Sequence, residues 1–546
     1  MLNRIKNNRK FISAVRTSLL LQLFLLLLLS PVFGNDKDKV SLKGSTAAAG
    51  IFSDSVHNLV LDSAGIENFF KVFPAKNNTK IPVQQFYLKR GYKFAWVTEM
   101  GLTSGAFSFY QQMKSDSRDF ADESLNNVKL DSLFDDLFQN EQTFFTNKSR
   151  AEMLELLLTS SFFKYAVKMY GGITKESKDL EWYIPRNKKN YIALLDSLVA
   201  WNPGEHLEEP VNEYYSRLRE QLKIFRAIGK NGGLPVVPTS KTLRSLGTRD
   251  SSLIIAKQYL SLTGDLTTND YTILFDDSLA NAVQHYQKRM GLAVTGNINP
   301  ATVMEMNKSI DMRIRQIMIN MERLRWAPVT MEKDYLLVNI PEFKLHVFEN
   351  NEPVWVTNVV VGKAVRQTSI FRDEVSQIVL NPYWNIPPSI TRNEILPHIR
   401  NNSNYLKNNN MEIVSGNPLV VRQKPGSGNA LGRVKFLFPN NYNIYLHDTP
   451  SKYLFSETNR AFSHGCIRVQ DPFWLAQYLL RKDSLWTAGK IAEIVTAGAS
   501  FSIKIDPVVP VYIVYFTAWV DSKGQINFRN DVYDLDKKLA LEIFEK

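Results

Sequence analysis

Cysteine is almost absent from this sequence, which has one, Cys466, among 546 residues. A single thiol cannot form an internal disulfide, so no disulfide framework holds the chain together. The thiol is therefore either incidental or kept free for reaction. Since a reactive thiol needs a base or a cation close by, the residues around Cys466 decide between these two interpretations.

Long apolar runs are equally scarce, and the one that stands out covers residues 19–29 near the N-terminus. Basic residues precede it and Ser30 to Gly34 follow it, which is the three-part layout of a secretory signal. The run is short of the roughly 20 apolar residues that span a bilayer as a helix. We expect residues 1–34 to direct export to the periplasm with cleavage near Gly34, and an uncleaved inner-membrane anchor is the alternative.

The sequence has no basic or acidic tail, and its formal charge of +12 is spread along the chain. In an exported chain, this distribution argues against a nucleic acid partner and suits an anionic polymer such as a cell wall. With 44% hydrophobic and 22% charged residues, the composition is that of a folded protein. The length predicts three or four domains.

Two helical regions come first. Residues 43–245 have apolar residues at spacings of three and four, as in 150–169, and predict a helical scaffold domain with a boundary near Gly232-Gly233. Residues 250–308 predict a compact three-helix domain. Its expected helices cover 253–262, 277–290 and a short stretch that starts at Asn299-Pro300.

After Trp326 the apolar residues change to a spacing of two, which predicts strands. The expected strands cover 343–347, 354–361, 376–380, 419–422, 434–438 and 443–446. They predict a mainly β catalytic domain over 333–506, so the fold class is multidomain α+β. Strand-like residues 511–519 and a Ser522-Lys523-Gly524 turn predict that 507–546 adds a terminal hairpin and tail.

The strand pattern is interrupted at 387–415. Residues 391–394, Thr-Arg-Asn-Glu, have the capping-box pattern that opens a short helix, and an asparagine-rich stretch follows through Asn410. An insertion placed before the segment that holds Cys466 is a candidate helical lid. A passive surface excursion is the alternative.

The residues around Cys466 are those that nucleophilic chemistry needs. Its run is Ser463-His464-Gly465-Cys466-Ile467-Arg468, and His447 lies upstream at an expected strand end. An ordinary thiol has a pKa of about 8.5 and is mostly protonated at neutral pH, so a base must take its proton. A strand-end histidine and a cysteine in a following turn can face each other, which predicts Cys466 as nucleophile and His447 as general base.

The neighbours of the thiol predict the rest of the site. On an extended backbone, His464 would point to the same side as Cys466 and support substrate or an oxyanion. The backbone amides of Gly465 and Cys466 would form an oxyanion hole. Arg468 would hold a substrate carboxylate or lower the pKa of the thiol, and Ser463 is assigned to substrate binding.

Two alternatives use the same residues differently. A structural cysteine would be buried and inert, although a run of small and polar residues is an unusual core. Zinc has legitimate ligands in His447, His464 and Cys466, but no obvious fourth ligand accompanies them. We expect no metal and no cofactor.

Residues 275–292 and 295–302 resemble the small three-helix peptidoglycan-binding domain of bacterial wall enzymes. Tyr286 and Thr295 stand where that family usually has Phe and Asp. The resemblance implies that this domain binds peptidoglycan.

His447, followed after fifteen residues by Ser463-His464-Gly465-Cys466-Ile467-Arg468, resembles the signature of L,D-transpeptidases, the cysteine enzymes that cross-link peptidoglycan. The order of the domains is similar to that of the large Gram-negative members of this family. Some members have Asn where Arg468 stands, so the resemblance defines the carboxylate contact less closely than the nucleophile.

This resemblance implies a two-step acyl transfer on peptidoglycan stem peptides. Cys466 would attack the third residue of a tetrapeptide stem, release the terminal D-alanine and form a thioester, which the amine of a neighbouring stem resolves to a 3-3 cross-link. It also implies that carbapenems acylate the thiol. Carboxypeptidase activity or amino-acid exchange at the same thioester, and a non-catalytic peptidoglycan-binding anchor, remain as alternatives.

Overall fold

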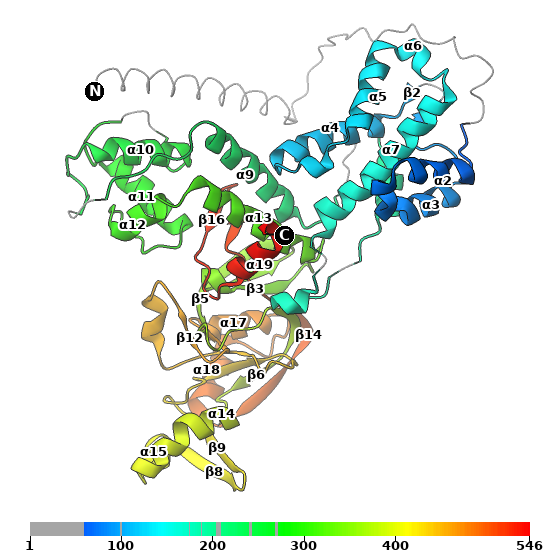
Figure 1. The fold of residues 1–546 in the computed structure, drawn as a ribbon. Coiled ribbons are helices and arrows are strands. Elements are labelled where there is room, and N and C mark those ends of the chain that lie inside the picture. The colour runs from blue at the N-terminus through cyan, green and yellow to red at the C-terminus, as the bar shows by residue number, and fades with distance from the viewer. Residues whose placement is uncertain are drawn as a thin grey trace.

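A computed structural model describes residues 59–98, 101–173, 175–186, 188–203, 209–239, 243–267 and 271–545. The expected export signal at 1–34 lies outside these residues. Every helix within the described ranges is too short or too polar to cross a membrane. A scaffold domain and a three-helix domain stand side by side above a β domain (Figure 1).

The scaffold domain is helical, as its apolar spacing predicts. Its elements are α2 Ser63–Val72, η1 Pro74–Thr79, α3 Lys80–Lys89, β1 Val97–Thr98, β2 Gly101–Leu102, α4 Ser104–Asp119, η2 Glu123–Leu125, α5 Val128–Gln139, α6 Glu141–Phe144, α7 Lys148–Ala166, η3 Val167–Gly171, η4 Ser177–Leu180, α8 Tyr191–Val199 and α9 Glu213–Lys230. Side chains are buried around nearly the whole circumference of α7, so the other helices pack around it. The Asn147 side chain accepts a hydrogen bond from the Arg150 amide and caps its N-terminus.

The three-helix domain consists of α10 Ser252–Leu262, α11 Asp277–Arg289 and α12 Pro300–Met306, close to the predicted helices. Asp276 caps α11, and Asn299 caps α12 with Pro300 at its first position. The fully buried Gln287 ties the loop after α11 to this domain, because its amide accepts from the backbone of Thr295 and donates to the carbonyl of Asn297.

Helix α13, Ile310–Trp326, connects the domains. It packs against α9, and the buried ion pair between Arg323 and Asp536 joins it to the last helix, α19 Leu535–Phe544. The Trp326 ring meets Trp182 of the scaffold edge-on, with ring centroids 5.7 Å apart. These contacts place α13 at the junction of all three domains (Figure 1).

The β domain is a closed barrel. Its strands are β3 Tyr335–Asn339, β4 Lys344–Glu349, β5 Glu352–Gly362, β6 Phe371–Leu380, β10 Val434–Leu437, β11 Leu446–His447, β12 Ala461–Ser463, β13 Ile467–Val469 and β14 Phe501–Val514. The sheet order is β12-β5-β13-β11-β10-β6-β14-β3-β4, and pairing of β4 with β5 closes it. Its helices are η5 Ile340–Glu342, η7 Lys452–Ser456, α17 Pro472–Leu479 and α18 Ala488–Ala497.

Two predicted strand starts are wrong by one and three residues. Phe343 has a φ of 57° and Asn443 a φ of 55°, which is left-handed backbone that a strand cannot contain. Strand β4 therefore begins at Lys344, and β11 begins at Leu446.

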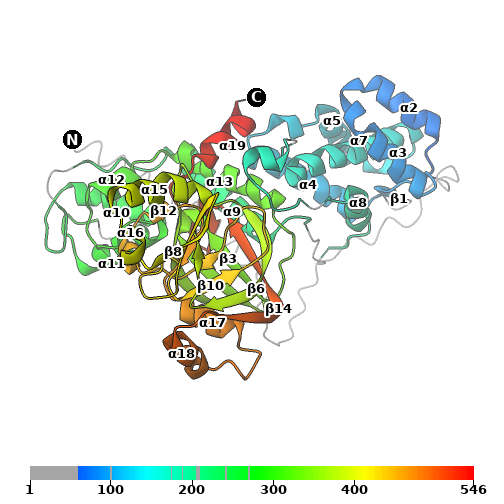
Figure 2. The same cartoon turned by 90° about the horizontal axis from the view of Figure 1, so that it is seen from below.

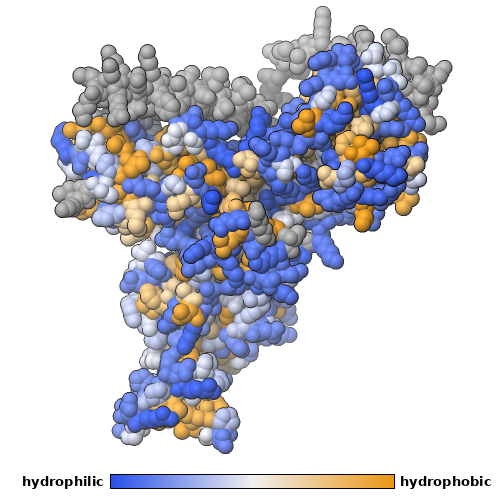
Figure 3. Space-filling model, in the orientation of Figure 1, coloured by the Kyte–Doolittle hydropathy of each residue, from blue (hydrophilic) through white to orange (hydrophobic). Residues whose placement is uncertain are grey.

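The interruption after β6 is a small subdomain, residues 384–423, which we call the insert. Its elements are β7 Trp384–Asn385, α14 Pro388–Ile390, η6 Thr391–Ile395, α15 Leu396–Asn401, α16 Tyr405–Asn408, β8 Met411–Gly416 and β9 Leu419–Gln423. It has its own core of Ile386, Ile390, Ile395 and Val421. It projects from one end of the barrel (Figures 1 and 2), and Figure 3 shows apolar surface at its tip, where Ile413, Val414 and Val420 are exposed.

The structure corrects two predictions for this region. The strand at 419–422 is β9, which belongs to the insert's three-stranded sheet β7-β9-β8 and not to the barrel. The predicted capping box is also wrong, because the helix begins at Pro388 and Thr391 lies inside it. The Thr391 hydroxyl donates to the Ile386 carbonyl and caps no helix.

The C-terminal region is not a separate tail. Strand β14 runs through the predicted boundary at 506/507 and pairs with β6 and β3 in the barrel. The predicted strand at 511–519 is two strands, because the chain leaves the barrel after Val514 and Thr517 bonds to Asn320 of α13. Strands β15 Ala518–Val520 and β16 Ile526–Phe528 then form the expected hairpin, which packs in the same core as the three-helix domain.

Candidate active site

Strand register places the two residues expected to carry chemistry on one face of the barrel wall. Parallel strands β11 and β13 align Leu446 with Ile467 and His447 with Arg468. Because side chains alternate, His447 and Cys466 lie on the face opposite the buried Leu446 and Ile467. Strands about 4.8 Å apart, with about 3.3 Å per residue, give a diagonal separation of roughly 8 Å between their backbones. The two side chains are long enough to reach each other across this distance.

The Cys466 side chain is half-buried, so the thiol is neither sealed in the core nor fully exposed. Its Sγ donates to the carbonyl of Asn443 at 3.5 Å and makes no hydrogen bond to His447 in this state. Burial raises the pKa of the Cys466 thiol, whereas hydrogen bonds from Tyr445 and the charges of Lys435 and Arg468 lower it. The balance favours the protonated thiol.

His447 is buried and neutral. Burial, followed by the charges of Arg468 and Lys435, lowers the pKa of His447 to about 3. Its Nδ1 is 2.5 Å from the carbonyl oxygen of Asp448, and a carbonyl only accepts, so Nδ1 carries the ring proton. This tautomer leaves Nε2 unprotonated, which is the form that a general base requires.

Two residues that the sequence analysis did not single out complete this face. The ring of Tyr445 is edge-on to His447, with centroids 5.6 Å apart, and Lys435 Nζ lies 3.9 Å above the Tyr445 ring. Lys435 is opposite His447 in the β10–β11 register. The Tyr445 side chain acts on the pKa of the thiol, and the side chain of Trp384, a residue of the insert, acts on the pKa of Tyr445, so both lie close to its hydroxyl. Tyr445 therefore links the thiol to the insert.

Ser463 holds the turn at the thiol. It is buried, its hydroxyl donates to the Cys466 carbonyl at 2.6 Å, and it accepts from the Gly465 amide at 3.1 Å. Both interactions are within the loop, so the geometry does not favour the expected substrate contact. The Gly465 amide already donates to the Ser463 hydroxyl. The Cys466 amide bonds to no described residue, so it is the half of the expected oxyanion hole that is free to donate to a substrate.

Gly465 also changes the direction of the chain. Its φ is 116°, which favours glycine, and its carbonyl accepts from the Thr368 hydroxyl at 2.7 Å. The extended backbone expected between His464 and Cys466 is therefore wrong. The His464 ring instead approaches the insert, with Nε2 2.9 Å from Oε1 of Glu394.

Arg468 lies on the same face, directly opposite His447. Its Nε is buried without a hydrogen-bond partner in the described part of the chain, and burial lowers the pKa of this guanidinium. Neither Arg468 nor Lys435 has a carboxylate within 4 Å among the described residues. Two cations without anionic partners therefore flank the thiol.

The zinc alternative would require His447, His464 and Cys466 to converge. In the described ranges, no three His, Cys, Asp or Glu side chains are grouped as metal ligands would be. His464 turns toward Glu394, and His447 Nδ1 donates to a backbone carbonyl. The three residues therefore do not form a common site in this structure.

Comparison with known proteins matches three segments of the chain. Residues 82–222 match a "Scaffold domain", residues 249–306 a "Putative peptidoglycan binding domain", and residues 333–508 the "L,D-transpeptidase catalytic domain" named YkuD. The last match contains both His447 and Cys466.

A curated protein of Haemophilus influenzae, named "Putative L,D-transpeptidase", is 32% identical over 248 residues, or 42% of this chain. The match spans about half of that relative, 49% of its length. Solved L,D-transpeptidases from Xylanimonas cellulosilytica and Stackebrandtia nassauensis are 14% and 12% identical, with TM-scores of 0.19 and 0.20. The alignments cover 51% of this chain in both cases, and 100% and 96% of those chains.

Proposed function

We propose that the chain, whose residues 333–508 match the L,D-transpeptidase catalytic domain, forms 3-3 cross-links in peptidoglycan through a thioester on Cys466. The observation that carries the proposal is the placement of Cys466 and His447 on one face of adjacent strands, between two cations without carboxylate partners. A peptidoglycan-binding domain in the same chain would hold the polymer near this face.

In the first step the Cys466 sulfur attacks the carbonyl at the third residue of a tetrapeptide stem. Because the resting pair is a neutral thiol and a neutral imidazole, the proton moves from Sγ to His447 Nε2 as the carbon–sulfur bond forms. The amide of Cys466 donates to the developing oxyanion. His447 then returns the proton to the departing amine of D-alanine, which leaves a thioester.

In the second step the side-chain amine of a neighbouring stem attacks the thioester. His447 takes a proton from this amine, the carbon–sulfur bond breaks, and the thiol is restored. Splitting the exchange in this way requires that water is kept from the thioester. We propose that the insert, which reaches the site through Trp384 and Glu394, excludes water as a lid.

Arg468 and Lys435 would bind the carboxylates of the stem peptide. Both lie on the face of the thiol, and the substrate would supply the anions that the described residues do not. Lys435 would act as a point charge, whereas Arg468 offers two parallel donors to a carboxylate. The same cations lower the pKa of the thiol, so they also favour its attack.

The proposed substrate also predicts where the protein acts and which compounds inhibit it. Peptidoglycan lies outside the inner membrane, so we propose that the protein acts in the periplasm, with residues 1–34 as its export signal. We further propose that carbapenems acylate Cys466, since a β-lactam carbonyl presents the same electrophile as the stem peptide.

The test is to incubate the purified protein with disaccharide tetrapeptide and to identify the products by mass spectrometry. A cross-linked dimer together with free D-alanine supports transpeptidation. Tripeptide alone would show that water resolves the thioester and that the enzyme is a carboxypeptidase. Cys466→Ala should form neither product, and a variant that still made the dimer would refute the assignment of the nucleophile.

A further inference from the structure

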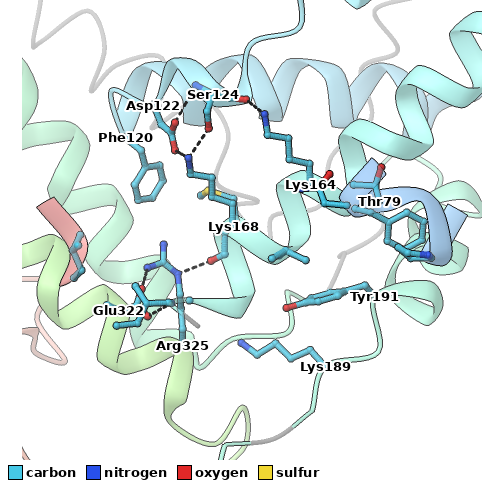
Figure 4. A pocket seen from close by; sticks show the side chains of 18 of the residues that line it. Thr79, Phe120, Asp122, Ser124, Lys164, Lys168, Lys189, Tyr191, Glu322 and Arg325 are labelled. Carbon is cyan, nitrogen blue, oxygen red and sulfur yellow. Dashed lines mark hydrogen bonds and ion pairs between the residues drawn. The ribbon is translucent and has the colours of Figure 1, made fainter. Parts of the chain in front are cut away.

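A cavity of about 1130 Å³ lies where the scaffold domain meets α13 and the end of α19 (Figure 4). Its walls come from η1, the loop after α4, the end of α7, the start of α8, α13 and α19. None of the described residues that line it belongs to the catalytic domain. The cavity is therefore separate from the face that carries Cys466.

The way α7 ends builds one side of this cavity. Its last turn, η3, widens to a π-helix and stops at Gly172, whose φ is 75°. The freed carbonyls accept from cations: Met169 O from Arg325 Nε at 2.7 Å, and Tyr170 O from Lys189 Nζ at 2.5 Å. A Cβ on Gly172 would lie 2.3 Å from Glu322 Oε1, so only glycine lets α13 approach this closely.

At this end of the cavity the cations outnumber the carboxylates. Arg325 pairs with Glu322 at 2.6 Å, which leaves Lys189 without a carboxylate within 4 Å among the described residues. Burial and the charge of Arg325 lower the pKa of Lys189 to about 8. The Tyr191 hydroxyl faces the same space (Figure 4) and bonds to no described residue.

At the opposite end of the cavity the cations also outnumber the carboxylates. Lys168 pairs with Asp122 at 2.5 Å, and the neighbouring Lys164 bonds to the Ser124 carbonyl and to no other described residue. Burial and the charge of Lys168 lower the pKa of Lys164, and burial followed by the charge of Lys164 lowers the pKa of Lys76. Figure 4 shows Lys164 and Lys189 on opposite sides of the cavity.

Between the two charged ends the wall is largely apolar. It includes Phe163, Val167, Ile192, Met318, Ile543 and Phe544. An apolar cavity with a few polar groups at defined places is the usual form of a site for a small ligand. A ligand here would need an apolar middle and an anion at each end.

We propose that this cavity binds an elongated dicarboxylate, the chemical class that includes short acidic peptides, with one carboxylate at Lys189 and Tyr191 and the other at Lys164. Each carboxylate supplies the anion that its lysine lacks, and the apolar wall contacts the span between them. The site is independent of the reaction at Cys466.

Binding is measured by isothermal titration calorimetry on the full-length protein with three probes of equal chain length. Suberate carries two carboxylates, octanoate one and 1,8-octanediol none. Suberate should bind more tightly than octanoate, and octanediol should bind least. Adipate and sebacate, the shorter and longer dicarboxylates, test the span.

The variants Lys164→Met and Lys189→Met should each weaken suberate about tenfold or more, the effect expected from losing one charge-assisted contact. Octanoate should lose affinity in one of the two variants only, since it occupies one end. Lys490→Met is the matched control, because Lys490 pairs with Glu493 on the surface of α18, and it should bind suberate like the parent. Thermal unfolding is measured to check that each variant is folded. If a methionine variant is unfolded, Lys164→Gln or Lys189→Gln is used in its place.

Three outcomes would overturn the proposal. The first is that no dicarboxylate binds. The second is equal affinity for octanoate and suberate, which would mean a single anion site. The third is suberate binding that survives in both lysine variants, which would place the ligand elsewhere on the protein.

Discussion

His464 of the catalytic turn and Glu394 of the insert face each other, with Nε2 and Oε1 2.9 Å apart. Arg366 approaches the same carboxylate oxygen at 3.4 Å. The side chain of Trp384, also in the insert, lies close to the Tyr445 hydroxyl beside the thiol. Two separate contacts therefore couple the insert to the turn that presents Cys466.

The first prediction concerns the contact between His464 and Glu394. Glu394→Ala removes the partner of both His464 and Arg366, so the insert should be held less firmly over the site. We expect kcat/KM for dimer formation to fall by roughly 3- to 10-fold, the range for losing one polar contact, with the thermal unfolding of the barrel unchanged.

Glu412→Ala is the control for this change. Glu412 pairs with Arg422 of the insert and with Lys424, which directly follows it, and makes no described contact to the catalytic turn. It should keep the parent activity. If both variants lost activity equally, the effect would come from the insert as a whole and not from its contact with His464.

The second prediction concerns removal of part of the insert. Replacing 389–410 by a short Gly-Ser linker removes α14 to α16 and disrupts a core that is separate from that of the barrel. Turnover should therefore fall far more than the unfolding temperature of the barrel. Parallel loss of activity and of barrel stability would show that the segment is structural.

The third prediction concerns the Tyr445 hydroxyl. Tyr445→Phe removes the hydroxyl that lowers the pKa of Cys466. The variant retains the aromatic ring beneath Lys435. The pKa of the thiol should rise, so the rate of alkylation by iodoacetamide should shift to higher pH. Tyr442→Phe, at a more exposed ring, should leave the alkylation profile in place. A profile that moved to lower pH in Tyr445→Phe would contradict this account.

The fourth prediction concerns Glu155, buried in α7, which accepts hydrogen bonds from the amides of Ala95, Trp96 and Val97. Burial raises its pKa from 4.5 to about 7 in the folded protein. Between these values the folded chain binds more protons than the unfolded chain, so this group lowers the free energy of unfolding as pH rises. The free energy of unfolding should fall by an amount on the order of 3 kcal/mol by pH 8 because of this group.

This loss is measured as the difference in unfolding free energy between the parent and Glu155→Gln, which cannot titrate, from pH 4 to pH 8. The parent should lose stability relative to the variant as pH rises. Glu152→Gln, on the same helix and paired with Lys148, should show no such trend. A difference that is independent of pH would mean that the pKa of Glu155 is the same in the folded and unfolded protein.

Much of the fold was predictable because it depends on local patterns. The caps at Asp276 and Asn299 define helix starts, and the alternation after Trp326 defines strands. The insert was visible only as an interruption. Its own sheet was missed because β9 has the same alternation as a barrel strand, and only pairing with β7 and β8 distinguishes it.

The site was predictable in part for a similar reason. Cys466 and His447 could be singled out as candidates because both residue types are rare here and their spacing is short. Lys435 and Tyr445 were missed because their relation to the thiol depends on the register of β10 and β11, which no local pattern encodes. The direction of His464 was mistaken because the φ of Gly465 turns the chain.

The most direct test of the central claim is the intact mass of the protein during turnover of disaccharide tetrapeptide, quenched in acid and followed by peptide mapping. The account predicts an adduct with the mass of the disaccharide tripeptide acyl group, on Cys466, that disappears when the acceptor amine is added. Cys466→Ala should carry no adduct. An adduct on another residue, or cross-linking by Cys466→Ala at the parent rate, would contradict it.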